Sequence, residues 1–336
     1  MTPKKSKPQT GARLSTQPGN QPGSRRTAPT AFERAWASPR ERSEPPPTVS
    51  GRWLAMALGI SVAGAALCAW GALCLLFWQG AWQLLYHPAA TVTRTPASVG
   101  IRFDAVGFAT TEAGVPRLAG WWIPAAPDAG RLTVLYLHGR DGNLSDTVDS
   151  LAALHQAAGV NVLAFDYRGY GQSQFARPSE AHWREDAAWA LDYLTATRHI
   201  APGAITLEGD GLGANLALEV AAAHPELAGA IVQSPMQTPA DAIFNDGRAH
   251  LVPAHLLVRD RFDMNAPSAS LRIPSLWFAV SGQQQGSSAY DKVPARKMRV
   301  WLPQGAVERR DFSESLMRWL TELGRSSAFQ NGPVDR

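Results

Sequence analysis

Cysteine is nearly absent from this sequence of 336 residues. Its two cysteines, Cys68 and Cys74, both lie inside one long apolar run. Outside that run the chain therefore has no thiol and forms no disulfide. Charge is also sparse, since 18% of the residues are charged whereas 45% are hydrophobic, which is enough to build a large buried core.

The apolar run is uncharged and extends over 26 residues from Trp53 to Trp78. Because about 20 apolar residues cross a bilayer as a helix, it predicts a transmembrane helix over 53–78. A signal peptide has a shorter apolar region close to the N-terminus, followed by small residues at a cleavage site. Here 52 residues precede the run and the bulky segment 82–86 follows it, which favours an uncleaved anchor.

Residues 1–52 are basic and rich in proline. They contain ten Lys or Arg, three Glu and nine Pro, which predicts a disordered tail. The net charge of residues 1–52 is therefore +7, and because the net charge of the whole chain is +4, residues 53–336 carry a net charge of about −3. A basic flank beside a membrane span indicates topology rather than nucleic-acid binding, because cationic segments stay in the cytoplasm. We expect a single-pass protein of the inner (plasma) membrane with a cytoplasmic N-terminus, a periplasmic or otherwise extracytoplasmic domain, and no nucleic-acid partner.

Strand-like and helix-like patterns alternate from about residue 100 onward. The strand-like runs are 101–108, 118–123, 132–137, 160–165, 205–207, 228–232, 275–280 and 298–302, and the helix-like stretches are 146–157, 181–196, 211–224 and 311–323. Two strands without a helix between them, followed by strand–helix units, predict an α/β fold with a mostly parallel eight-stranded sheet covered by helices on both faces. We expect this domain to span 84–323 and the polar residues 324–336 to form a flexible C-terminal tail.

Local motifs follow one another along the predicted domain. They are His138–Asn143 (HGRDGN), Asp166–Ser173 (DYRGYGQS) with Pro178–Glu180 after it, Gly209–Gly213 (GDGLG), and Ser234–Pro235 with Arg259–Asp263 (RDRFD). This ordered series resembles the α/β-hydrolase superfamily, and in particular its single-pass, membrane-anchored branch of serine aminopeptidase-like or abhydrolase-domain proteins. The resemblance covers about residues 84–323. It implies an α/β-hydrolase fold and a catalytic triad in the chain order Ser, Asp or Glu, His.

The residues that the resemblance requires for catalysis are missing. The elbow pattern G-x-S-x-G has its flanking glycines at Gly209 and Gly213, but Gly211 stands where the nucleophilic serine belongs. The acid position corresponds to Gln285, although Asp291 leaves a shifted acid open. The base position corresponds to Val307, and no histidine follows His255 anywhere in the sequence. We therefore expect no catalytic triad.

Part of the family's oxyanion hole is implied to survive, because its donors are backbone N–H groups. The resemblance assigns them to Arg140 and to Leu212, where they would hold a carboxylate or phosphate without converting it. Water filling the same place is the alternative. Asp210 completes the elbow as a polar turn residue, since Glu208 and Leu212, two positions away on either side, are too large for Asp210 to be the nucleophile.

Two further patterns resemble cofactor-binding motifs, but the residues around them lack groups that such binding requires. Residues 209–214 match G-x-G-x-x-G/A, yet no acidic residue ends the next strand near 232–234, as dinucleotide binding requires. His250 and His255 lack an accompanying cysteine or carboxylate cluster for a metal. We expect no cofactor and no metal.

These observations predict a membrane-anchored α/β-hydrolase-family protein that is catalytically inactive, a pseudoenzyme that binds a small anionic ligand or a membrane-protein partner. Two alternatives stay open. One is an active acyl-ester or peptide hydrolase with a rearranged site built on Ser234 or Ser281. The other is a purely structural partner of another membrane protein.

Overall fold

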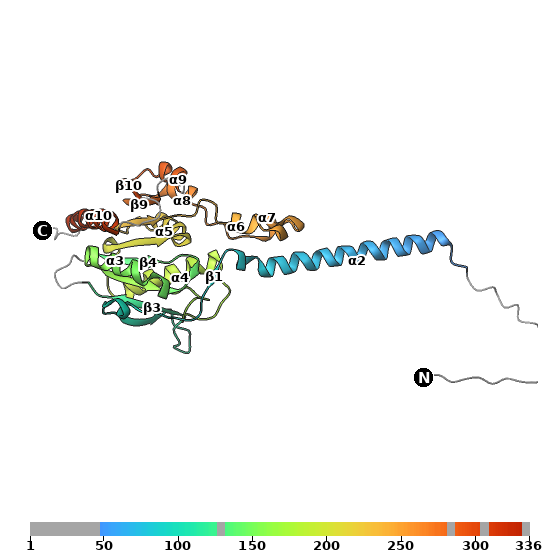
Figure 1. The fold of residues 1–336 in the computed structure, drawn as a ribbon, viewed down its shortest axis with the longest axis horizontal. Coiled ribbons are helices and arrows are strands. Elements are labelled where there is room, and N and C mark those ends of the chain that lie inside the picture. Colours follow the sequence, from blue (N-terminus) through green and yellow to red (C-terminus); the bar gives the residue numbers. More distant parts are fainter. Residues whose placement is uncertain (1–47, 126–131, 281–285, 303–308, 331–336) are drawn as a thin grey trace, which may run out of the picture. The chain divides into compact units, whose positions relative to one another are not determined.

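The computed structural model of the chain describes residues 48–125, 132–280, 286–302 and 309–330 (Figure 1). The chain divides into two units, Met1–Ile60 and Ser61–Arg336. Helix α2 (Gly51–Gly80) carries the apolar run, and the hydroxyl of Ser50 accepts a hydrogen bond from the N–H of Trp53 in its first turn. With a mean hydropathy of 2.1 and few buried residues, this helix is long and apolar enough to be a candidate membrane span.

An eight-stranded sheet forms the centre of the second unit. Its strands are β2 (Asp104–Phe108), β3 (Leu118–Ile123), β4 (Thr133–Leu137), β6 (Asn161–Phe165), β7 (Ile205–Asp210), β8 (Gly229–Gln233), β9 (Ser275–Val280) and β10 (Lys297–Leu302). They lie in the order β10-β9-β8-β7-β4-β6-β3-β2. Strand β3 runs antiparallel to both of its neighbours and the other pairs are parallel. The sheet is therefore mixed, with a parallel majority, and not purely parallel.

The central strands are apolar along their whole length. Every residue of β4 is buried, and its sequence Thr-Val-Leu-Tyr-Leu presents side chains to both faces of the sheet. A strand buried on both faces loses the alternation of apolar and polar residues, because helices cover both sides. This explains why unbroken apolar runs in the sequence mark the strands.

Helices cover the two faces of the sheet unequally. On one face α3 (Val148–Ala158) and α10 (Arg309–Gln330) pack together, and Leu151 and Trp319 join the same apolar cluster as Tyr136 of β4. On the other face α4 (Glu180–Asp192) and α5 (Leu212–Ala223) supply the cluster that contains Trp183 and Leu216, and α8 (Asn265–Ser270) packs against α5.

Helix α10 corrects the expected C-terminal boundary. It continues to Gln330, past residue 323 where the sequence analysis ends the domain. No proline occurs between Leu323 and Pro333, so nothing in this stretch stops the helix from propagating. The expected flexible tail 324–336 is thus helical as far as Gln330.

Short elements complete the described chain. They are η1 (Ala81–Leu84), β1 (His87–Pro88), η2 (Pro96–Val99), β5 (Asp141–Gly142), η3 (Leu144–Thr147), η4 (Tyr193–Thr197), η5 (Pro202–Ala204), α6 (Asp241–Phe244), η6 (Gly247–Leu251), α7 (Ala254–Leu257) and α9 (Ser287–Lys292). Strand β1 pairs with β5 in a separate two-stranded sheet. Because β5 lies in the loop after β4, this pairing ties the segment that follows α2 and η1 to the carboxyl edge of the main sheet.

Candidate functional site

The turn between β7 and α5 is the centre of the candidate site. Gly211 stands there at the N-cap of α5 with φ 55° and ψ −120°. Its N–H donates a hydrogen bond to the carbonyl of Gln233 at 3.0 Å, which fastens the turn to the end of β8. Positive φ is accessible to glycine at no steric cost and strains other residues. A strand thus passes into a helix through a single left-handed residue.

The two flanking glycines are required by packing. A Cβ on Gly209 would overlap the backbone of Gly213 and Ala214, and a Cβ on Gly213 would overlap the carbonyls that end β4. A Cβ on Gly211 would instead meet only the Cα of Gly139, at 4.0 Å. The space at position 211 is therefore open, and the loop after β4 lies directly beside it.

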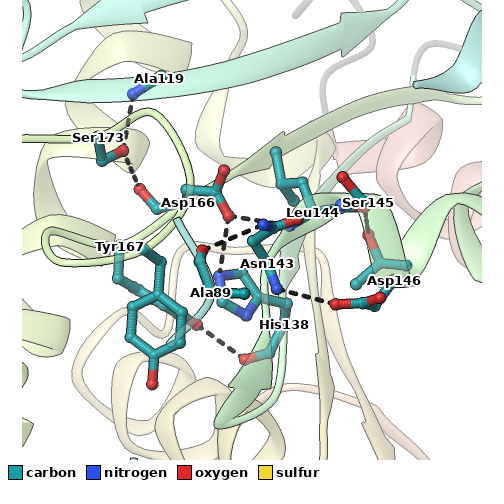
Figure 2. A network of polar contacts seen from close by, with 12 residues as sticks. Ala89, Ala119, His138, Asn143, Leu144, Ser145, Asp146, Asp166, Tyr167 and Ser173 are labelled. Carbon is teal, nitrogen blue, oxygen red and sulfur yellow. Dashed lines mark hydrogen bonds and ion pairs between the residues drawn. The ribbon is translucent and has the colours of Figure 1, made fainter. Parts of the chain in front are cut away.

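A buried polar network holds that loop in place (Figure 2). The ring of His138 is fully buried, with Nδ1 2.7 Å from the carbonyl of Gly139 and Nε2 3.7 Å from Asp166 Oδ1. Burial lowers the pKa of His138 to about 4, so the ring is neutral at physiological pH. Burial also raises the pKa of the Asp166 carboxyl to about 7. This carboxyl accepts a hydrogen bond from the N–H of Leu144 at 2.9 Å.

Asn143 connects the same loop to the segment after α2. Its amide Nδ2 donates to the carbonyls of Ala89 (3.1 Å) and Thr91 (2.8 Å), and its Oδ1 accepts from the N–H of Ser145 (2.8 Å) (Figure 2). A buried amide with these three hydrogen bonds fixes backbone positions on both sides of it. The shape of the site therefore depends on residues outside the elbow.

Arg140 brings a cationic group to this loop. Its carbonyl accepts hydrogen bonds from the Tyr170 hydroxyl (2.9 Å) and from the N–H of His87 (3.0 Å). Its Nη1 is buried and has no hydrogen-bond partner in the part of the chain that the structure describes. His87 Nδ1 lies 2.5 Å from Asp141 Oδ1. No motif in the sequence distinguishes His87, so this pair was not predicted.

Two carboxyl groups of β7 lie near the elbow. Glu208 is buried, its Oε1 accepts a hydrogen bond from Gln233 Nε2, and its Oε2 has no partner among the described residues. Burial, reinforced by the nearby charge of Asp210, raises the pKa of Glu208 to about 8. Burial likewise raises the pKa of Asp210. The sequence analysis treated Glu208 only as a neighbour of the elbow.

The remaining candidate residues are not all brought together. Gln285, Val307 and Ser281 lie outside the described residues. Ser234 directly follows β8 with φ 43°, a strained conformation for serine. His250 and His255 line a separate cavity of about 350 Å³ between η6 and α7. Within the described ranges, no cluster of His, Cys, Asp and Glu is arranged to hold a metal ion.

The model of one family, described as serine aminopeptidase, S33, matches residues 128–307 of this chain. This match extends over more than half of the sequence and includes β4, β7, the elbow and the strands that follow. The chain belongs to the serine aminopeptidase S33 family. This membership agrees with the ordered motifs that the sequence carries.

Several proteins resemble this family member. The Mycobacterium tuberculosis protein Rv2307c is 32% identical over 220 residues, which are 65% of this chain and 75% of the relative. Protein bem46 of Schizosaccharomyces pombe is 30% identical over 102 residues, or 30% of this chain and 34% of bem46. The structure of the Pyrococcus furiosus esterase PF2001 superposes with a TM-score of 0.54 at 19% identity, covering 71% of this chain and 98% of the esterase. At that identity the superposition shows a shared α/β-hydrolase fold.

The elbow geometry predicts a graded response to substitution. Gly211→Ser places a side chain in open space but in a strained backbone, so it should cost about 1–3 kcal/mol of unfolding free energy. Gly209→Ala and Gly213→Ala place a Cβ inside neighbouring backbone, so each should cost more, about 4 kcal/mol or above. Thermal unfolding of the full chain in detergent measures the order. A Gly211→Ser protein that melts at or above the parent temperature would contradict the strained turn.

The buried carboxyl of Glu208 predicts a pH-dependent stability. Its pKa rises from 4.5 when unfolded to about 8 when folded. Between these values the unfolded chain releases the proton and the folded chain keeps it, so the folded state loses stability as the pH rises through this window. Glu208→Gln should therefore match the parent near pH 5 and melt at a higher temperature near pH 8. Glu112→Gln, on an exposed side chain, is the control. A constant difference across pH would refute a protonated Glu208.

Proposed function

We propose that this S33-family chain is a pseudoenzyme, a hydrolase-fold protein that binds a ligand or partner without hydrolysing it. The observation that carries the proposal is glycine at position 211, with φ 55° in the elbow and no side chain to attack a substrate. Acyl transfer by this fold needs an oxygen nucleophile, a base that takes its proton and a group that orients the base. The absence of any histidine after His255 removes the base as well.

The histidine beside the elbow is unsuited to replace the missing base. His138 has 1% of its surface exposed, and its Nδ1 is engaged with the carbonyl of Gly139. Its pKa of about 4 makes it a weak base at neutral pH. The ring serves instead as part of the network that supports the loop.

An anionic ligand fits the groups that remain. The N–H of Leu212 is among the first of helix α5 and has no intrahelical partner, so it is available to a carboxylate or phosphate. The Arg140 guanidinium, whose Nε lies 3.6 Å from Asp141 Oδ2, adds a charged group on the neighbouring loop. The open space beside Gly139 leaves room for a small group in place of the serine side chain.

A membrane anchor completes the proposal. Helix α2 supplies a span of sufficient length, and the basic residues of 1–52 precede it. Cationic flanks favour the cytoplasmic side, so the hydrolase-fold domain would lie outside the cytoplasm in a single-pass protein of the inner membrane. Binding would then take place at the membrane surface, with either a small anionic ligand or another membrane protein.

A rearranged active site is the second candidate function. The observation that favours it is the positive φ of Ser234, because strained residues cluster at functional sites. Against it, no hydrogen bond joins the Ser234 hydroxyl to a histidine in the described part of the chain. A hydrolase of this type would cleave acyl esters or peptides with Ser234 as nucleophile.

Activity-based labelling separates the two candidates. We expect the full chain to resist fluorophosphonate labelling and to leave p-nitrophenyl butyrate unhydrolysed. Gly211→Ser should stay at or below the roughly 10³–10⁴-fold acceleration over water that a site without a triad retains, because the triad acts as a unit. Stoichiometric labelling of the parent that disappears in Ser234→Ala would replace the pseudoenzyme with the rearranged hydrolase.

Reporter fusions test the anchor and its direction. The basic flank should keep the N-terminus in the cytoplasm and place the C-terminus outside it. Alkaline phosphatase fused after Arg336 should therefore be active, and green fluorescent protein fused at the same position should not fluoresce. Fluorescent protein fused before Met1 is the matched control and should fluoresce. The opposite pattern at both ends would reverse the orientation, and a chain found in the soluble fraction would remove the anchor.

A further inference from the structure

A second cavity lies away from the elbow, at the C-terminal end of α2. It has a volume of about 230 Å³. Helix α2 and η1 contribute Trp78 and Trp82, the loop before α4 contributes Arg177, and the segment after α7 contributes Arg259. None of its lining residues belongs to the elbow or to the loop after β4.

The charge of this cavity is positive. Arg259 is exposed and makes no ion pair or hydrogen bond within the described ranges. Arg177 donates from Nη2 to the carbonyl of Trp78 at 2.7 Å, and burial lowers its pKa, against the opposing effect of the Asp260 charge. The acidic residue of the lining is Asp260, whose Oδ2 accepts a hydrogen bond from the Tyr86 hydroxyl at 2.8 Å. The cavity is therefore lined by two guanidinium groups and by one carboxylate that is already hydrogen-bonded.

Aromatic rings border the same charges. The Trp78 side chain is about half exposed, and the guanidinium of Arg177 lies 5.8 Å from the centre of its ring. Trp82 also lines the cavity. Tryptophan beside arginine at the end of an apolar helix is typical of the level where lipid headgroups meet the hydrocarbon core.

The segment Gly247–Leu257 contacts α2 about two turns before the cavity. The indole N–H of Trp70 donates to the carbonyl of Leu251 at 3.1 Å. About 20 residues suffice to cross the hydrocarbon core, so a core edge at Trp70 would place Trp78, about 12 Å further along α2, among the lipid headgroups. Leu251 and Leu256 are 60% and 82% exposed there. Apolar side chains on this segment would be covered by acyl chains at the surface of the bilayer.

We propose that the cavity binds the headgroup of an anionic phospholipid, with the acyl chains passing along α2 beside Leu251 into the membrane. The proposal rests on the proposed membrane anchor. The arginine side chains would donate to the phosphate, and the tryptophans would cover the glycerol. A volume below the roughly 300–1,000 Å³ of most ligand pockets suits a headgroup rather than a whole lipid.

Native mass spectrometry of the full chain, released from membranes by mild detergent, tests this site. The parent should retain phosphatidylglycerol, and Arg259→Gln should retain about fivefold less, the effect of one cation near an anionic surface. Arg259→Lys keeps the charge and should restore most of the binding. The matched control is Arg248→Gln, since Arg248 is also exposed but pairs with Asp246 outside the cavity lining.

Three further measurements make each outcome decisive. Sedimentation with membranes comes first, because a chain that stays in the soluble fraction would contradict the membrane anchor itself. If the chain sediments with membranes but the parent and Arg259→Gln retain equal amounts of lipid, only the proposed lipid site is contradicted. Equal retention of phosphatidylcholine would contradict anionic selectivity. Thermal unfolding in phosphatidylcholine nanodiscs should shift upward with phosphatidylglycerol. An equal shift with inorganic phosphate in detergent would reassign the site to a free anion.

Discussion

The close approach of α5 to the ends of β7 and β4 is the constraint on which the site depends. Without a side chain at Gly213, the first turn of α5 lies against the carbonyls of Leu137 and His138. Without one at Gly209, β7 lies against the same turn. Between these two contacts the chain reverses at one residue with positive φ, Gly211. The elbow is thus shaped by packing on either side of the central residue.

The loop after β4 is held in place by buried polar groups outside the elbow. Neutral His138, Asp166 and Asn143 are all buried and take part in the same network (Figure 2). Leaving a buried polar group unpaired costs about 1–3 kcal/mol, so the hydrogen bonds of Asp166 and Asn143 favour one loop conformation. Because Asn143 also holds Ala89 and Thr91, the loop is connected to the segment that follows α2 and η1. The side-chain amide of Asn143 therefore links the loop at the candidate ligand site to the chain segment that follows the candidate membrane helix.

The sequence predicted the main strands well because both faces of the sheet are covered. Continuous apolar runs gave β3 and β9 their full ranges and most other strands to within a few residues. The two-residue strands β1 and β5 have no such pattern and were missed. Buried Glu208 was also missed, because the alternation Ile-Thr-Leu-Glu in β7 resembles a strand with one solvated face. The contact between Trp70 and Leu251 joins residues 181 positions apart, which local patterns do not encode.

The persistence of the elbow around a glycine follows from these packing constraints. If positive φ at position 211 served catalysis alone, loss of the serine would remove the reason for it, and the turn could relax to ordinary geometry. Here the flanking glycines and the hydrogen bond from Gly211 to Gln233 keep the turn whatever residue occupies it. Glycine adopts the required φ without the strain that serine would carry. The fold therefore keeps the strand–turn–helix geometry and the open space beside Gly139 at a lower conformational cost.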